Sequence, residues 1–287
     1  MRISTIDDRF AAQRSRSRTR LREVLPAIAE ASELSRVPEL VRRWGTEFVA
    51  CEDLSSTMVA AVCRAGYLPM ALDLPGLPVL LVKSHHLRAV LRFSALHVTR
   101  NAGRYARGLR MFVDRHPRRT LETIVESYED RWLTPALVET LMEIAKRPTE
   151  GMTVHSVEIY NGDRFVAGEL GYVVGRVYTS LSGFHRQNGA GTVQLIALAE
   201  VLRTGGAAFW DLGMPAEYKL NLGAELLPRT EFLATYRRQL ETGGDGRIVF
   251  PREPVACDAV VDAARGREVS ARRDGTRTPA AADEERT

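Results

Sequence analysis

The sequence predicts an α+β protein made of a small N-terminal domain and a larger domain with a mixed, mostly antiparallel sheet. Its 287 residues are enough for one large domain or two small ones. Hydrophobic residues make up 45% and charged residues 26%, which is ordinary for a globular protein that buries a core. The hydrophobic period changes from helical spacing to strict alternation near Val154, which indicates helices first and a sheet afterwards.

The chain is expected to open with a basic arm. Six arginines lie between Arg9 and Arg22 with no acidic residue among them, and such a run of like charge favours a mobile segment. We expect the arm to lead into a helix over Leu21–Ala31. Arm and helix together form the predicted segment 1–50.

Residues 51–130 form the predicted N-terminal domain. Ser55–Ala65 has its apolar residues at helical spacing, Val79–Val82 is a short apolar strand, and Asn101–Val113 resembles a basic amphipathic helix. Another helix, Thr134–Ile144, lies near the start of the next predicted domain, 131–245.

The second domain begins its sheet with alternating apolar residues. Three strands are expected, with a tight turn at Asn161-Gly162 between the first two: Val154–Tyr160, Arg164–Tyr172 and Arg176–Ser180. A helix over Thr192–Arg203, ended by Gly205-Gly206, and a buried strand over Ala207–Leu212 follow. A short helix with Tyr218 and Leu222 comes next. Antiparallel strands, a helix and one more strand are the order typical of a GCN5-related N-acetyltransferase core. The tail, 246–287, has no sustained apolar period from Arg252 onward and is expected to be disordered.

Several classes of protein are excluded by composition. No apolar run approaches the ~20 residues that span a bilayer, and the N-terminus lacks the apolar stretch of a secretory signal. The cysteines, Cys51, Cys63 and Cys257, have no metal-ligand or disulfide-framework spacing, so neither a metal site nor disulfides are expected. We therefore expect a cytoplasmic protein.

Positive charge is concentrated in one segment. Between Lys83 and Arg119 the chain carries nine arginines and one lysine against the single acid Asp114, which gives a local charge of +9 in a chain of net charge +4. Such a surplus predicts an anionic partner, most often a phosphate backbone. The alternative is a solvated helix face in an arginine-rich sequence.

Two features could carry chemistry. The loop Arg186–Gly191 fits the glycine-rich loop with which acetyltransferases hold the pyrophosphate of coenzyme A, or it is a plain turn with Thr192 as the N-cap of the next helix. Asp211 ends an apolar strand, where a carboxylate is costly to bury unless it is paired or functional. It could hold an amine or take a proton, or it could cap the following turn.

Other polar and aromatic residues are assigned no catalytic role. Trp132, Tyr160, Tyr178 and Phe184 have strand spacing that is more typical of a core than of a substrate pocket. The pair His85-His86 and Ser182 match no nucleophile motif.

An ordered set of short motifs resembles the leucyl/phenylalanyl-tRNA–protein transferase family. The set covers roughly residues 51–240 and consists of Ala65-Gly66-Tyr67-Leu68-Pro69, Leu96-His97-Val98-Thr99-Arg100, Arg131-Trp132-Leu133-Thr134-Pro135, His155-Ser156-Val157-Glu158-Ile159-Tyr160, Gly168-Glu169-Leu170-Gly171 with Gly175, Trp210-Asp211, Leu222-Gly223-Ala224 and Pro228-Arg229. The resemblance implies a small N-terminal domain, an acetyltransferase-like catalytic domain, and transfer of an amino acid from aminoacyl-tRNA to an amine without metal or coenzyme A.

The resemblance also implies which residues form the site. Asp211 would hold or deprotonate the amine, Trp132 would bind the aminoacyl adenosine, and the arginines that meet the tRNA would be Arg100, Arg104, Arg107 and Arg110. Three positions depart from the family pattern: Gly213 replaces a glutamine proposed to act in proton transfer, Leu181 a glutamate of the substrate pocket, and Met70 a tryptophan. Candidate walls for the aminoacyl side chain are Tyr178, Phe184 and Ile196.

The sequence thus predicts an aminoacyl-tRNA-dependent aminoacyltransferase that needs no cofactor. Its acceptor is either a protein N-terminus or a small-molecule amine, such as an antibiotic or a biosynthetic intermediate, and the departures keep both open. The alternatives are a coenzyme A-dependent N-acetyltransferase and a non-catalytic tRNA-binding protein.

Overall fold

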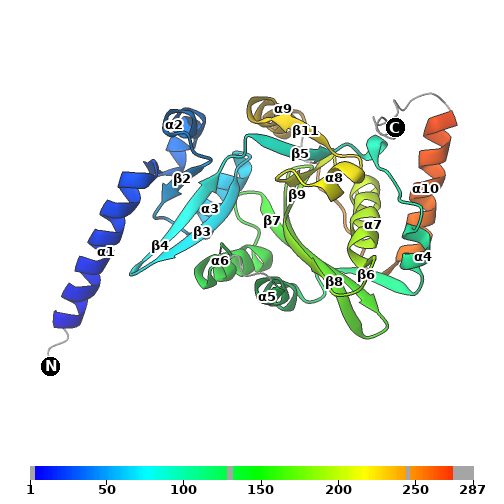
Figure 1. The fold of residues 1–287 in the computed structure, drawn as a ribbon, viewed down its shortest axis with the longest axis horizontal. Helices are drawn as coiled ribbons and strands as arrows, with labels where there is room; N and C mark the ends of the chain where they lie inside the picture. The colour runs from blue at the N-terminus through cyan, green and yellow to red at the C-terminus, as the bar shows by residue number, and fades with distance from the viewer. Residues whose placement is uncertain (1–3, 128–131, 244–245, 274–287) are drawn as a thin grey trace, which may run out of the picture.

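Two β-sheets joined by one apolar core make up the protein (Figure 1). The computed structural model describes residues 4–127, 132–243 and 246–273. The first sheet has four strands in the order β1-β2-β4-β3, with β1 parallel to β2 and the other pairs antiparallel. Its strands are β1 (Ala27–Ile28), β2 (Phe48–Cys51), β3 (Leu68–Leu74) and β4 (Leu77–Lys83).

The second sheet has eight strands in the order β11-β5-β10-β9-β8-β7-β6-β12. Only β10 and β9 run parallel, so the predicted mixed, mostly antiparallel sheet is confirmed. Its strands are β5 (Leu87–Leu91), β6 (Leu109–Val113), β7 (Met152–Asn161), β8 (Arg164–Val174), β9 (Val177–His185), β10 (Phe209–Gly213), β11 (Glu225–Pro228) and β12 (Val255–Ala256).

Helices cover both faces of the larger sheet (Figure 1). One face packs against α7 (Ala190–Thr204), α4 (Ala102–Ala106) and α10 (Cys257–Arg273), and the other against α5 (Pro117–Ser127) and α6 (Pro135–Lys146). The remaining helices are α1 (Ser4–Val24), η1 (Ala31–Arg36), α2 (Val37–Trp44), α3 (Ser56–Arg64), η2 (Phe93–Ala95), α8 (Glu217–Asn221) and α9 (Arg229–Thr242). No helix in the described ranges is both long and apolar enough to cross a membrane.

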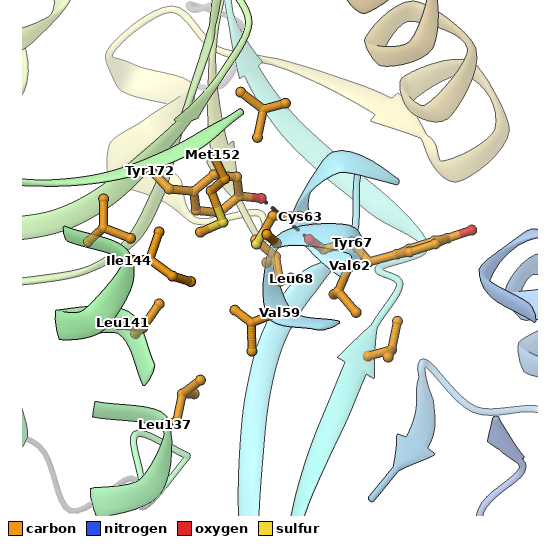
Figure 2. Packing of buried hydrophobic residues seen from close by; sticks show 14 of the residues in the cluster. Val59, Val62, Cys63, Tyr67, Leu68, Leu137, Leu141, Ile144, Met152 and Tyr172 are labelled. Atoms are coloured by element: carbon orange, nitrogen blue, oxygen red, sulfur yellow. Dashed lines mark hydrogen bonds between the residues drawn. The ribbon is translucent and has the colours of Figure 1, made fainter. Parts of the chain in front are cut away.

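One apolar cluster runs from the small sheet into the large one. Figure 2 shows Val59 of α3 on the side of Leu137 and Leu141 of α6, and Cys63 of α3 near Tyr172 of β8. All five side chains are buried. The two sheets are therefore held together by a shared core.

Local sequence explains several element boundaries. Helix α3 begins after Ser55, whose hydroxyl accepts from the Met58 amide, and α6 after Thr134, whose hydroxyl accepts from the Leu137 amide. The turn at Asn161-Gly162 is confirmed, with Gly162 at φ 59° in the left-handed region that favours glycine. Helix α7 ends with Gly205 as its C-cap, as predicted.

The helix predicted over Asn101–Val113 is wrong. Helix α4 ends at Ala106, the chain turns through Gly108 at φ 72°, and Leu109–Val113 pairs with β7 as strand β6. The glycine breaks the helix, and the alternating burial of the following residues belongs to a strand.

Both predicted termini are also wrong where the structure describes them. The basic arm is the helix α1, whose Arg18 binds Glu52 at 2.6 Å and whose Leu21 is buried. Of the helix expected over Leu21–Ala31, only the residues up to Val24 are helical, as the end of α1, and β1 follows at Ala27–Ile28. The tail forms β12 and α10, because Cys257, Val261 and Ala264 lie on one helix face and are buried.

The sheets divide the chain differently from the predicted domains. The small sheet ends at Lys83, and both β5 and β6 belong to the large sheet although they lie within the predicted N-terminal domain, 51–130. The boundary at 130–131 falls outside the described residues.

Candidate active site

The centre of the site is a buried ion pair between Asp211 of β10 and Arg88 of β5. Two hydrogen bonds join them, from Arg88 Nε at 2.9 Å and from its terminal nitrogen at 2.7 Å. Asp211 is 0% exposed and Arg88 is 2% exposed. Burial disfavours the charged guanidinium, but the negative charge of Asp211 outweighs it and raises the pKa of Arg88. The Arg88 guanidinium also lies 4.5 Å from the ring centroid of Phe232.

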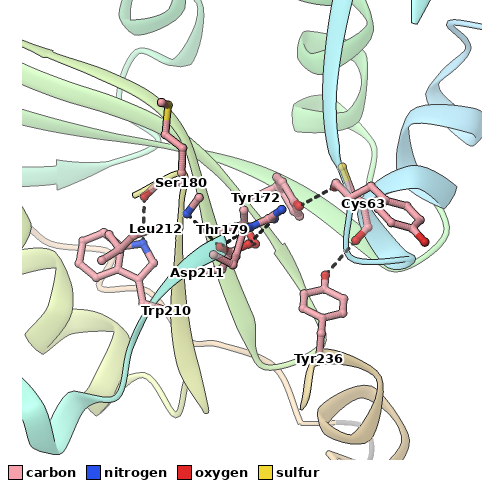
Figure 3. Close-up of polar contacts among 12 residues, drawn as sticks. Cys63, Tyr172, Thr179, Ser180, Trp210, Asp211, Leu212 and Tyr236 are labelled. Carbon is pink, nitrogen blue, oxygen red and sulfur yellow. Dashed lines mark hydrogen bonds and ion pairs between the residues drawn. The ribbon is translucent and has the colours of Figure 1, made fainter. Parts of the chain in front are cut away.

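Every acceptor position of Asp211 is in use. Besides Arg88, its oxygens accept from the Thr179 hydroxyl at 3.1 Å and from the Gly213 amide at 2.9 Å. Figure 3 shows Asp211 and Thr179 facing one another, with Tyr172 on the same side of the sheet. A carboxylate with four donors and no exposure has no lone pair left for an incoming amine, so this geometry suits a positioning role.

Gly213 lies where β10 ends, and a Cβ at this position would fit only in van der Waals contact with its neighbours. Its φ is 77°, and a Cβ built there would contact only Leu68 Cδ1 and the Ser180 carbonyl oxygen, both at 3.8 Å. Lys219 fixes the flanking backbone, because its Nζ donates to the Leu212 and Met214 carbonyl oxygens at 2.6 and 2.8 Å. Burial lowers the pKa of Lys219 to about 8.

A second buried carboxyl, Glu169 of β8, lies on the opposite face of the sheet from Asp211. Its oxygens accept from the Tyr178 hydroxyl at 3.0 Å, the Ser180 hydroxyl at 2.9 Å and Gln194 Nε2 at 3.1 Å. Burial raises the pKa of Glu169 to about 7 although these three donors oppose the shift. Ser180 also accepts from Trp210 Nε1 at 2.9 Å (Figure 3) and is partly exposed.

The predicted substrate residues Met70, Trp132 and Leu181 do not all belong to one core. Met70 of β3 pairs with Leu81 of β4, which packs against the separate small cluster beside Leu21. The Trp132 carbonyl accepts from the amide of the next residue on β3, Ala71, at 3.0 Å. Leu181 follows Ser180 on β9. Leu181 and Trp132 pack, partly buried, against the same core as Leu68.

The three predicted pocket walls do not come together. Phe184 packs in the core on the α5 side of the sheet, whereas Tyr178 and Ile196 are fully buried in the core on the α7 side. Strict alternation would place Tyr178 and Phe184 on the same face, and the register irregularity between β8 and β9 puts them on opposite faces.

The glycine loop, Arg186–Gly191, has a packing explanation. A Cβ at Gly189 would lie 2.3 Å from Cγ of Tyr105, so the Tyr105 ring already occupies the space beside the loop. Helix α7 starts at Ala190 with Gly189 as N-cap, two residues before the expected Thr192. This arrangement favours the plain-turn interpretation.

The predicted tRNA-binding arginines are exposed but do not share one face, because Arg110 alternates on β6 with Leu109 and Met111 of the α7-side core. Arg100, Arg104, Arg107 and Arg110 are all exposed. Arg104 and Arg107 share a groove with Asp258 and Asp262 of α10, which reduces the positive potential there. Arg88, counted in the same basic segment, is not part of this surface because it is buried against Asp211.

Sequence reasoning missed Arg88 and Glu169 as parts of the site. Arg88 lies in the apolar run Leu87–Leu91, so a charge inside a strand was the signal, as it was for Asp211. Glu169 appeared only within a family motif, and nothing in the sequence shows that Tyr178, Ser180 and Gln194 converge on it. Among the described residues, no group of three His, Cys, Asp or Glu side chains could hold a metal ion.

Residues 90–237, slightly more than half of the chain, match the sequence profile of the leucyl/phenylalanyl-tRNA protein transferase family. The chain belongs to this family. As a family member it is an aminoacyltransferase.

Two curated members of this family align with the chain over most of their own length. The leucyl/phenylalanyl-tRNA–protein transferase of Xylella fastidiosa strain 9a5c is 30% identical over 195 residues, which cover 65% of this chain and 76% of the relative. That of Pseudomonas aeruginosa PAO1 is 31% identical over 199 residues, 67% of this chain and 85% of the relative.

Solved structures align at lower similarity. FemX aligns with 12% identity and a TM-score of 0.37 over 71% of this chain and 78% of its own. A GCN5-related N-acetyltransferase from Kribbella flavida aligns with 15% identity and a TM-score of 0.35 over 71% of this chain and 75% of its own.

Proposed function

We propose that this family member transfers the amino acid of an aminoacyl-tRNA to the N-terminal amine of a protein. The amine attacks the ester carbonyl, a C–N bond forms, the ester C–O bond breaks, and the proton lost by the amine finally reaches the ribose oxygen that leaves. Because the ester is already activated, the enzyme mainly has to desolvate and orient the two reactants.

The observation that carries this proposal is the place of Gly213, without a side chain at the end of β10 and beside Leu68 of the small sheet. This position lies next to Leu68 and the Ser180 carbonyl, and Leu68 shares its core with Trp132 and Leu181. The buried Asp211 holds the Gly213 amide and Arg88 in place without touching a reactant. In this assignment Asp211 is a positioning residue, and Gly213 makes space for the amine.

Glu169 is the proposed proton acceptor. Its pKa of about 7 lets it exchange a proton near neutral pH, and the partly exposed Ser180 hydroxyl bonded to it is the path by which the proton enters. An ideal general base has a pKa close to the working pH, which an ordinary surface glutamate does not.

The acceptor is tested by offering two amines at once. Purified protein, tRNA charged with labelled amino acids, a peptide beginning with Arg or Lys and a small-molecule fraction are incubated together, and label in acid-stable amide is located by mass spectrometry. We expect label on the peptide. Label only on a small molecule would replace the protein acceptor by a small amine, and label on neither in the presence of charged tRNA would overturn the proposal.

A further inference from the structure

Four aromatic rings form a continuous row across neighbouring strands on the α5 side of the large sheet. Phe112 of β6, Tyr160 of β7, Phe165 of β8 and Phe184 of β9 follow one another with centroid separations of 5.4, 5.1 and 4.9 Å. Tyr160, Phe165 and Phe184 are buried, so their faces are not available to stack on a nucleobase. The row can therefore contact a ligand only through the side chains that pack on its outer surface.

Three exposed arginines lie on this row. The Arg115 guanidinium is 4.3 Å from the Phe112 centroid and 4.9 Å from the Tyr160 centroid, and Arg119 is 5.4 Å from that of Phe165. Arg186 is 5.4 Å from the Phe184 centroid. Contact with a ring orders an arginine while its N–H donors stay available at the edge of the plane.

Few carboxylates neutralise these arginines. Among the described residues, Arg115 and Arg119 have no ion-pair partner, and Arg186 has only Glu126 at 3.9 Å, with both of these side chains more than half exposed. The nearby Glu158 is buried and accepts from the Arg115 and His116 amides. A surface ion pair as loose as that of Arg186 contributes little and is easily exchanged for another anion.

We propose that Arg115, Arg119 and Arg186 bind successive phosphates of the donor tRNA. This inference rests on the proposed function for the identity of the RNA. Strand β9 links the row to the site, since Ser180 and Phe184 are four residues apart, about 13 Å along a strand. An RNA backbone on the row would thus be within reach of Gly213 through its terminal nucleotides. The recognition would be independent of base sequence, because only phosphates are contacted.

This surface is separate from most of the one predicted from sequence, of which only Arg110 pairs with a residue of the row, Tyr160. Arg104 and Arg107 lie on α4 and its following loop, on the α7 side of the large sheet, whereas Arg115 and Arg119 lie beside or on α5 on the other side. Substitutions can therefore test the two surfaces independently.

The test uses the full-length protein and uncharged total tRNA as the probe, with affinity measured over a range of salt concentrations. The variant R115Q/R119Q/R186Q is compared with R118Q, whose arginine is exposed on the same helix but bonded to Glu139 at 2.8 and 3.0 Å, and with R100Q/R104Q/R107Q. Circular dichroism confirms that each variant is folded. A fourth variant with lysine at positions 115, 119 and 186 keeps the charge and loses the planar contact.

We expect the triple glutamine variant to raise the Kd for tRNA at least about tenfold, and to reduce the slope of log Kd against log salt by about 2, since each phosphate contact contributes about 0.7–0.9. R118Q should change the Kd for tRNA less than twofold and leave its salt dependence unchanged. The lysine variant should keep the wild-type slope of log Kd against log salt. An unchanged Kd and slope in the folded triple glutamine variant would overturn the inference, as would a wild-type protein that binds no tRNA. Altered tRNA binding in a protein that transfers no amino acid would support the inference and refute the proposed function alone.

Discussion

Glu169 carries an ionisation that couples folding to pH. The usual carboxyl pKa of 4.5 rises to about 7 in the folded protein because the group is buried. Between these two values the folded state keeps a proton that the unfolded chain has lost, so stability falls as pH rises. Above pH 7 the loss of stability caused by ionising the buried Glu169 is complete and amounts to about 3 kcal/mol.

Substituting Glu169→Gln should remove this dependence. We measure the free energy of unfolding of both proteins in urea at pH 4.5 and at pH 8. We expect it to fall between these two pH values by about 3 kcal/mol more in the wild type than in the variant. If Glu169 accepts the proton of the amine, the variant should also lose the rise of kcat through pH 7. Parallel stability curves for the two proteins would show that the carboxyl is ionised in both states.

The Asp211–Arg88 pair leads to a different prediction, because its main cost arises when one partner is lost. Asp211→Asn leaves a buried guanidinium without its counter-charge and should lower stability by about 3–5 kcal/mol. Removing both charges in D211L/R88M should restore much of that stability while transfer stays low, since leucine offers the Gly213 amide no acceptor. Recovery of transfer together with stability would contradict the positioning role.

At the scale of elements, α10 is part of the core although its sequence is mostly polar. Cys257 and Val261 are fully buried, and Glu268 accepts from the Val98 amide at 3.0 Å. Val261→Asp should therefore destabilise the protein by about 3 kcal/mol or more, whereas Val269→Asp, on a residue 45% exposed, should stay within about 0.5 kcal/mol. Thermal unfolding of both variants checks this, and equal effects would mean that the helix does not dock.

The same helix shows what sequence can and cannot predict. Helix α3 was predictable because its own apolar residues repeat at helical spacing, and β7 and β8 because β-branched and aromatic residues flank the turn signal Asn161-Gly162. Helix α10 has only three small or medium apolar residues on its buried face, and its stability comes from α7 and α4, which lie far away in the sequence. Local pattern cannot report a partner that only the tertiary fold supplies.

The site shows the same limit at closer range. Asp211 was recognisable as a charge in an apolar strand, but its partner Arg88 is 123 residues away and the two meet only through the pairing of β10 with β5. Alternation could place Tyr178 and Phe184 on strands, yet the register irregularity between Leu170 and Gly171 decides which face each one joins.

At the scale of the whole molecule, the two sheets share one core and should unfold together. The Tyr236 hydroxyl donates to the Cys63 carbonyl at 3.0 Å and the Tyr172 hydroxyl to the Tyr67 carbonyl at 3.3 Å, so buried hydrogen bonds cross the junction as well (Figure 3). A cooperative unit of this kind opens with one free energy wherever it is probed.

Native-state hydrogen exchange measures that free energy in each sheet separately. We expect peptides from β4 and from β8 to report the same opening energy in the wild type, because neither sheet can lose the shared core alone. Tyr236→Ala removes a fully buried ring from the junction and should lower stability by about 3–5 kcal/mol. We expect the opening free energy to fall more in peptides from β4 than in peptides from β8. Leu202→Ala is the matched control, since this buried residue of α7 packs in the other core and should lower both values equally. If Tyr236→Ala also lowers both equally, Tyr236 is not what couples the sheets, and the site beside Gly213 is held together by the remaining core of α3 and α6.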